Sequence, residues 1–150
     1  METIFTNGTD QRFIMLCEKL DQFLSSMNGE EKQKQFYDQY NTLSHIHDVI
    51  IMMEDGEAVG CGSFKKYDSY SVEIKRVYVA EEYRNKGIAR KIMSKLEELA
   101  KRKGYLKLVL ETGTAFTGAN HLYRSLGFQV IDNYGPYIGM PDSVCMEKVL

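Results

Sequence analysis

Apolar and polar side chains are arranged most regularly between residues 72 and 103. Val72, Ile74 and the run Val77-Tyr78-Val79 are β-branched or aromatic, which is typical of a strand, here ending near Ala80. The apolar side chains that follow recur mostly every three or four residues, as on one face of a helix, and Gly104 ends this pattern. They are Ile88, Ile92, Leu96, Leu99 and Ala100. The pattern predicts a strand that leads directly into an amphipathic helix.

The flanking sequence predicts further strands and helices. Upstream, we expect a strand over 2–7, helices over 10–25 and 30–40, and strands over 48–54 and 57–66 that are joined by an Asp55-Gly56 turn. Downstream, we expect a strand over 107–112, a helix over 119–128 closed by Gly127, and two closing strands, the last over 143–149. The length of 150 residues favours one domain over residues 1–150. The predicted fold is α/β, with a mixed, mostly antiparallel central sheet flanked by helices on both faces.

The connection between the central strand and its helix has the chemistry of an anion-binding site. It reads Arg84-Asn85-Lys86-Gly87-Ile88-Ala89. The start of a helix leaves backbone N–H groups without partners and carries the positive end of the helix dipole. Gly87 allows a ligand to approach closely, and Arg84 and Lys86 add full positive charges. We expect this loop to bind a pyrophosphate.

Two separated motifs identify the kind of nucleotide site. The chain lacks both the G-x-G-x-x-G fingerprint and the G-x-x-x-x-G-K-[ST] loop. Instead, R-x-x-G-x-A at Arg84–Ala89 resembles the coenzyme A signature of the GNAT acetyltransferase superfamily. At the expected distance downstream, A-x-x-L-Y-x-x-x-G-F at 119–128 resembles the end of the same superfamily's conserved block. The resemblance covers residues 70–131.

This resemblance implies an enzyme that uses acetyl-CoA as its co-substrate. The acetyl group would pass to a primary amine of a small molecule or peptide by direct attack on the thioester. The loop would bind the pyrophosphate, Asn120 the pantetheine arm, and a backbone N–H near Val79 the oxyanion. The implied cofactor-binding residues are Val77, Tyr78, Val79, Arg84, Asn85, Lys86, Gly87, Ile88, Ala89, Arg90 and Asn120.

Two side chains are candidates for acid and base catalysis. Glu73 lies four residues before Val77, hence on the same face of a regular strand, at a position that resembles that of the glutamate base in several family members. It could equally pair with a neighbouring charge, and Glu111 is a competing carboxylate. Tyr123 matches the position of the family's general-acid tyrosine. The alternative for Tyr123 is a purely packing role.

Composition and charge argue against several other classes of protein. A net charge of −2 gives no overall attraction for nucleic acid, and the longest purely apolar run, 49–53, is far too short to span a membrane. Three cysteines without C-x-x-C spacing indicate neither a disulfide framework nor a zinc site, so we expect a cytoplasmic protein. His45 and His47 have no further ligands with recognisable spacing nearby, so no metal site is predicted.

Some questions stay open at the level of sequence. The chain could be a non-catalytic acyl-CoA-binding module or sensor, although such a protein would need neither Glu73 nor Tyr123. The loop at 134–141, Tyr-Gly-Pro-Tyr-Ile-Gly-Met-Pro, could recognise the acceptor or cover the end of the sheet. The acceptor amine is not identified by any motif. Many GNAT-like proteins form dimers, so a homodimer is compatible with the resemblance.

Overall fold

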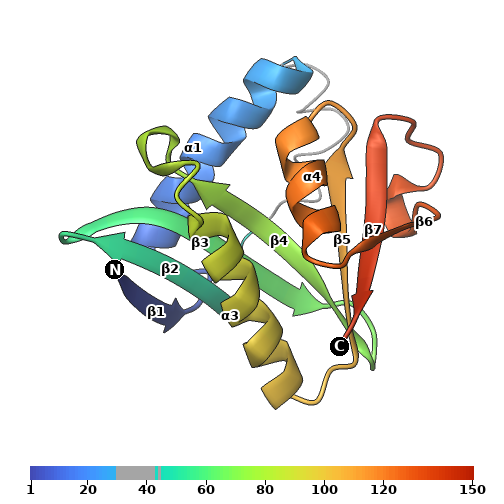
Figure 1. The fold of residues 1–150 in the computed structure, drawn as a ribbon, viewed down its shortest axis with the longest axis horizontal. Coiled ribbons are helices and arrows are strands. Elements are labelled where there is room, and N and C mark those ends of the chain that lie inside the picture. The colour runs from blue at the N-terminus through green and yellow to red at the C-terminus, as the bar shows by residue number, and fades with distance from the viewer. Residues whose placement is uncertain (30–42, 44) are drawn as a thin grey trace. The chain divides into compact units, whose positions relative to one another are not determined.

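The computed structural model describes residues 1–29, 43 and 45–150 (Figure 1). The helix predicted over 30–40 lies outside the described residues. The helices are α1 (Gln11–Asn28), α3 (Ile88–Arg102) and α4 (Thr117–Ser125), with short 3-10 turns at Glu81–Tyr83 and Gly135–Tyr137. The strands are β1 (Glu2–Thr6), β2 (Asp48–Glu54), β3 (Glu57–Lys66), β4 (Ser71–Val79), β5 (Lys107–Gly113), β6 (Gln129–Ile131) and β7 (Ser143–Val149).

The strands are hydrogen-bonded in the order β1-β2-β3-β4-β5-β7-β6. The pair β4–β5 is parallel, whereas β1–β2, β2–β3, β5–β7 and β6–β7 are antiparallel. This is the mixed, mostly antiparallel sheet that the sequence predicts. The contacts divide the chain into two compact units: unit 1 comprises Met1–Lys65 and Lys75–Leu96, and unit 2 comprises Lys66–Ile74 and Glu97–Leu150.

In unit 1, helices cover both faces of β3. The Asp10 carboxylate caps α1 by accepting a hydrogen bond from the backbone N–H of Arg12 at 2.9 Å. The apolar face of α1 packs with β2 and β3 in a buried cluster that includes Cys61. On the next residues of β3, Gly60 and Gly62 face Ile92 of α3 instead. Since successive side chains of a strand point to opposite faces, α1 and α3 cover opposite faces of β3, which confirms that part of the predicted fold.

Gly62 permits the close approach of α3, so we expect Gly62→Ala to destabilise the protein. A Cβ atom at Gly62 would overlap the Cγ2 atom of Ile92 and lie 3.1 Å from Cδ1 of Leu96. Overpacking of this kind lowers the free energy of unfolding by about 1–3 kcal/mol. Gly118→Ala is the matched control, because a Cβ atom there meets nothing within 4 Å inside α4. Urea denaturation of both variants measures the difference, and equal stabilities would contradict the packing argument.

Unit 2 is built on β5, which lies between the first residues of β4 and the whole of β7. Ser71–Glu73 pair with Lys107–Val109, and Lys107–Gly113 pair with Ser143–Val149. α4 ends three residues earlier than the sequence predicts, because Gly127 takes a positive φ of 98° and Phe128 N–H bonds back to the carbonyl of Tyr123 at 3.1 Å. Gly127 therefore closes the helix, as predicted. No helix among the described residues is long and apolar enough to cross a membrane.

Candidate functional site

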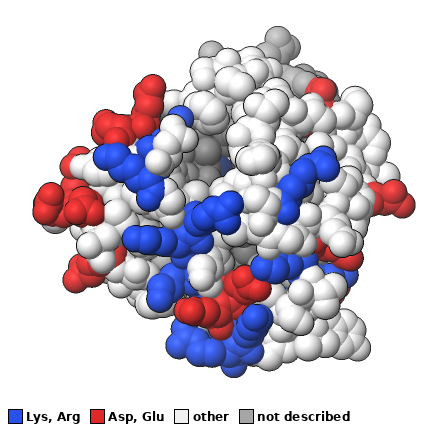
Figure 2. Space-filling view, viewed as in Figure 1, with Lys and Arg blue, Asp and Glu red and all other residues white. Residues whose placement is uncertain are grey.

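The loop before α3 has the backbone geometry of an anion-binding turn. Asn85 and Gly87 have φ values of 63° and 79°, and α3 begins at Ile88 with the N–H of Lys91 bonded to the Gly87 carbonyl at 3.2 Å. The first N–H groups of the helix have no partner within the helix ladder. A Cβ atom at Gly87 would meet nothing within 4 Å, so the space in front of this turn is open. Figure 2 shows Lys and Arg side chains gathered over the region where Figure 1 places α3.

The two basic side chains of the loop contact aromatic rings of unit 1. The Nε atom of Arg84 donates to the Val79 carbonyl at 2.9 Å, and the guanidinium carbon lies 5.2 Å from the ring centre of Phe23 and 5.6 Å from that of Tyr78. The Lys86 ammonium lies 5.4 Å from the ring centre of Tyr83. Arg84 thus ties the loop to the end of β4, a role that the sequence alone did not suggest.

A backbone irregularity in β4 corrects one step of the sequence argument. Arg76 has a φ of 60°, and its buried guanidinium donates to the Cys17 carbonyl at 3.0 Å and pairs with Asp21 at 2.8 Å. A left-handed residue inside a strand interrupts the alternation of side chains. The two-residue period therefore does not by itself extend from Glu73 to Val77, and the expectation that they share a face stays a prediction.

Glu73 is buried in unit 2 and accepts a hydrogen bond from a tyrosine. It is 4% exposed, and the Tyr134 hydroxyl donates to its Oε2 atom at 2.6 Å. Burial, together with the charge of Glu73 and this hydrogen bond, raises the pKa of Tyr134 far above its usual value. The phenol therefore keeps its proton and remains a donor. The loop at 134–141 that the sequence singled out thus supplies a direct contact to the candidate base.

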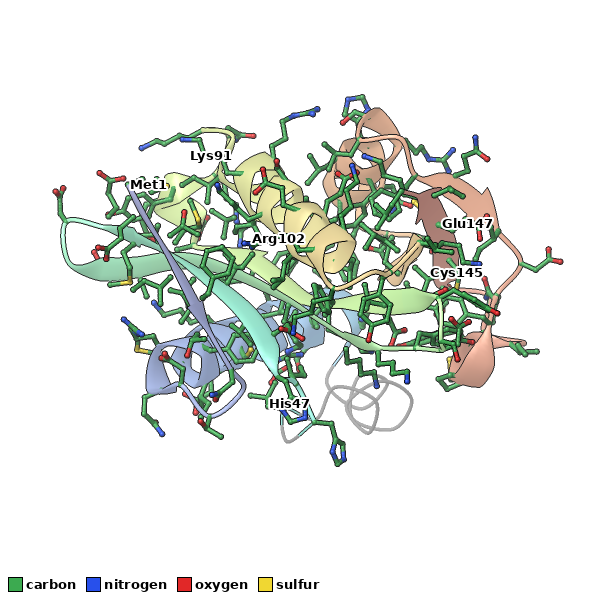
Figure 3. The ribbon with its side chains drawn as sticks, turned by 90° about the horizontal axis from the view of Figure 1, so that it is seen from below. Met1, His47, Lys91, Arg102, Cys145 and Glu147 are labelled. Atoms are coloured by element: carbon green, nitrogen blue, oxygen red, sulfur yellow. The ribbon has the colours of Figure 1, made fainter. Side chains whose placement is uncertain are left out.

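The second candidate carboxylate shares a face of unit 2 with Glu73. Glu73 pairs with Val109 of β5, Glu111 follows two residues later, and Cys145 of β7 pairs with Glu111. Figure 3 labels Cys145 and Glu147, both on β7. Burial raises the pKa of the Cys145 thiol, and the charges of Glu111 and Glu73 raise it further. Both carboxylates therefore act electrostatically on the same region of the sheet.

Tyr123 is buried, and its phenol holds its proton. Its side chain is 8% exposed and packs edge-on against Phe128, with ring centres 5.9 Å apart. Burial raises its pKa to about 12, with a further contribution from the charge of Glu111. The phenol is therefore protonated throughout the physiological range, as a general acid must be before it acts. The packing against Phe128 is compatible with that role.

Asn120 organises the connection between β5 and α4. Its amide nitrogen donates to the carbonyl oxygens of Gly113 at 2.9 Å and Phe116 at 2.8 Å. Both amide hydrogens therefore have partners within this connection, so an interaction with a pantetheine arm would fall to the Oδ1 atom.

His45 and His47 are exposed. In the described part of the chain, no group of three or more His, Cys, Asp or Glu side chains is placed to hold a metal ion.

Comparison with known proteins identifies relatives over most of the chain. The sequence model described as "Acetyltransferase (GNAT) family" matches residues 14–128. The uncharacterised N-acetyltransferase YsnE of Bacillus subtilis is 37% identical over 99 residues, which are 65% of this chain and 66% of that protein. The IAA acetyltransferase of Azospirillum brasilense is 30% identical over 138 residues, covering 91% of this chain and 90% of the relative.

Solved structures give the same assignment. A crystal structure from Klebsiella pneumoniae, described as that of an acyl-CoA N-acyltransferase, has a TM-score of 0.81 and 29% identity. The match covers 99% of this chain and 97% of the Klebsiella chain. A GNAT family acetyltransferase from Elizabethkingia anophelis, solved with acetyl-CoA bound, has a TM-score of 0.64 and 28% identity, covering 78% and 83%. The predicted α/β fold class is thereby confirmed at the level of the whole fold.

Proposed function

Because this chain belongs to the acetyltransferase (GNAT) family, we propose that it transfers the acetyl group of acetyl-CoA to a primary amine of a small molecule or peptide. The family and its N-acetyltransferase relatives confirm the predicted kind of enzyme. The amine, and direct attack on the thioester, are the proposal. The observation that carries it is the buried Glu73 carboxylate in the same unit as the buried Tyr123, whose pKa burial raises to about 12. A protein that only binds acyl-CoA has no use for this acid and base.

The proposed cofactor site follows the loop and its neighbours. Acetyl-CoA bound to the Elizabethkingia relative supports it as the co-substrate. The N–H groups of the turn at Gly87 and Ile88 would bind the pyrophosphate, with charge from the basic side chains around them. The full proposed set comprises Val77, Tyr78, Val79, Arg84, Asn85, Lys86, Gly87, Ile88, Ala89, Arg90 and Asn120.

The proposed mechanism needs one proton acceptor and one proton donor. An amine of pKa near 10.4 is almost entirely protonated at pH 7, so Glu73 takes one proton from the ammonium before or during attack. The neutral nitrogen attacks the thioester carbon, and a backbone N–H near Val79 stabilises the oxyanion. As the carbon–sulfur bond breaks, Tyr123 gives its proton to the departing thiolate. The attacking nitrogen loses its second proton as the amide forms, and this proton passes through water to the tyrosinate and restores the phenol.

Release of free thiol from acetyl-CoA tests this function. The panel of acceptors spans polyamines, amino acids, aminoglycosides and short peptides, and calorimetry measures CoA binding in parallel. We expect CoA to bind and thiol release to depend on an amine. Binding of CoA without release from any acceptor would favour an acyl-CoA sensor, and absence of CoA binding would refute both functions.

We expect Gly87→Ala to weaken CoA binding at least tenfold. The methyl group would stand in the open space in front of the turn, and a φ of 79° costs a non-glycine residue about 1–2 kcal/mol. Gly104→Ala is the matched control, because Gly104 at the other end of α3 has a φ of 88° and equally open surroundings. Both variants should lose similar stability in thermal unfolding. Equal CoA affinities in calorimetry would remove the loop from the cofactor site.

Three further expectations remain predictions. They are the single-domain organisation over residues 1–150, the cytoplasmic location and the homodimer. The three cysteines are free and buried.

A further inference from the structure

Two further tyrosine rings contact Tyr134, the residue that donates the hydrogen bond to Glu73. Tyr134 contacts Tyr67 with ring centres 5.0 Å apart at 70°, and Tyr137 at 5.7 Å and 90°. All four residues belong to unit 2. We call Tyr67, Tyr134 and Tyr137 the tyrosine cluster.

The tyrosine cluster extends from the buried carboxylate to the surface. Glu73 and Tyr137 are 4% and 2% exposed, Tyr134 is partly buried, and Tyr67 is 43% exposed. Aromatic rings in edge-to-face contact combine apolar area with negatively polarised faces. A group that approaches Glu73 past Tyr67 therefore meets aromatic surface first and a carboxylate afterwards.

The loop that carries two of these rings is held firmly. The side-chain amide nitrogen of Asn133 shares its two hydrogens among three carbonyl oxygens, those of Tyr137 at 3.1 Å, Met140 at 3.0 Å and Ser143 at 3.2 Å. The N–H of Tyr137 also bonds to the Tyr134 carbonyl at 3.0 Å. A site whose side chains are fixed before binding loses little entropy when a ligand arrives. The loop is therefore suited to present Tyr134 and Tyr137 in one arrangement.

The charges on this face favour a cation. Glu73 and Glu111 lie on the same face of the β4–β5 pair, and both raise the pKa of the Cys145 thiol between them and the loop. Aromatic faces attract ammonium groups, and a desolvated carboxylate does so more strongly. A carboxylate on the ligand beside its amine would instead be repelled by Glu73 and Glu111.

We propose that Glu73 and the tyrosine cluster form the acceptor subsite, that this subsite takes a cationic primary amine without an adjacent carboxylate, and that Tyr134 positions Glu73 within it. This inference rests on the proposed acetyltransferase function. Tyr134 keeps its own proton and fixes one oxygen of Glu73. Glu73 receives the proton that leaves the ammonium, and the nitrogen lone pair so freed forms the new bond to the acetyl carbon. Tyr134 thus acts through Glu73 and is a positioning residue.

A matched pair of ligands tests the charge preference. At about pH 6, where its α-amine is largely protonated, L-phenylalaninamide is a cation, whereas L-phenylalanine is a zwitterion of nearly the same shape. 1,4-Diaminobutane is a second cationic probe. We expect calorimetric titration of the CoA-saturated protein to show binding of a cationic probe, with phenylalanine at least tenfold weaker than its amide. Equal binding of amide and amino acid, or binding of neither cation to protein that binds CoA, would overturn the subsite. Failure to bind CoA would count against the proposed function instead.

Two variants separate the hydroxyl of Tyr134 from its ring. Tyr134→Phe removes only the hydrogen bond to Glu73 and should lower kcat at least tenfold with the best amine of the panel. Tyr134→Leu also removes the ring and should raise the KM for that amine at least fivefold more. The control is Tyr70→Phe at an exposed tyrosine of the same unit, which should match the wild type. A fall in kcat without a rise in KM would support positioning, because loss of thermal stability alone does not lower kcat selectively. A Tyr134→Phe enzyme with unchanged kcat and KM would exclude the positioning role.

Discussion

Glu73→Gln should lower kcat by about a thousandfold while leaving CoA affinity unchanged. General base catalysis is typically worth 10²–10⁴-fold, and the reaction proposed here must remove a proton from an amine that is almost fully protonated at neutral pH. Glutamine keeps the size of the side chain, and its carbonyl oxygen can still accept the hydrogen bond from Tyr134. The change therefore removes the base while keeping an acceptor for this hydrogen bond. Steady-state thiol release, with CoA binding by calorimetry, measures it.

The pH dependence of the variant gives a second readout. Without a base in the site, only the amine that is already neutral in solution can react, and that fraction rises tenfold per pH unit below a pKa near 10.4. The deficit of Glu73→Gln should therefore shrink as the pH rises toward 10.

Two control variants test whether this effect is specific to Glu73. Glu97→Gln is the first control, because Glu97 lies in the same unit and pairs with Lys148 at 3.1 Å. Lys148 is in register with Leu108 and Val72, so this ion pair lies on the other face of the sheet from Glu73. If Glu111→Gln lowered kcat more than Glu73→Gln does, the role of base would be assigned to Glu111.

Patterns that depend on neighbouring residues predicted much of the fold correctly. Strands β2 and β3 begin and end where the sequence places them on either side of the Asp55-Gly56 turn, with Asp55 and Gly56 at φ values of 49° and 79°. The start of α3 at Ile88 and the closing role of Gly127 were likewise readable, because glycine is favoured where φ is positive. These features are set by interactions within a few residues of the chain.

Features that depend on distant residues were not predictable in the same way. Nothing in the sequence around Arg76 signals a left-handed residue, because its guanidinium is held by the Cys17 carbonyl and Asp21 of α1. The contact of Arg84 with Phe23 is of the same kind. Period-two reasoning cannot be carried along β4 past this residue, since a left-handed residue interrupts the alternation of side chains.

The candidate site was predicted in its residue types more than in its contacts. The tyrosine-rich loop was singled out by composition, but the bond from Tyr134 to Glu73 joins residues 61 positions apart. The amide of Asn120 was assigned to a ligand by resemblance, whereas its two hydrogens bond to carbonyls of the β5–α4 connection. Resemblance indicates which side chains matter, and the fold determines what each of them touches.

Tyr123→Phe should lower kcat by about a hundredfold, at the low end of general acid catalysis. The leaving thiolate has a conjugate acid of pKa near 8.5, so it needs less help from an acid than an alkoxide would. Phenylalanine preserves the edge-on packing against Phe128, and the free energy of unfolding should change little. Thiol release under saturating amine measures kcat, and urea denaturation checks the stability.

The raised pKa of Tyr123 adds a second test of its role as the acid, namely the dependence of kcat on pH. Because burial and Glu111 raise that pKa to about 12, the wild-type enzyme should show no alkaline fall in kcat from loss of this proton up to about pH 11. If this tyrosine had an ordinary pKa near 10, the alkaline fall in kcat would begin a full pH unit or more earlier. Tyr70→Phe again serves as the control for removing a hydroxyl from unit 2. A loss below threefold in Tyr123→Phe would leave this tyrosine with its packing role alone, and the thiolate would then depart without an acid.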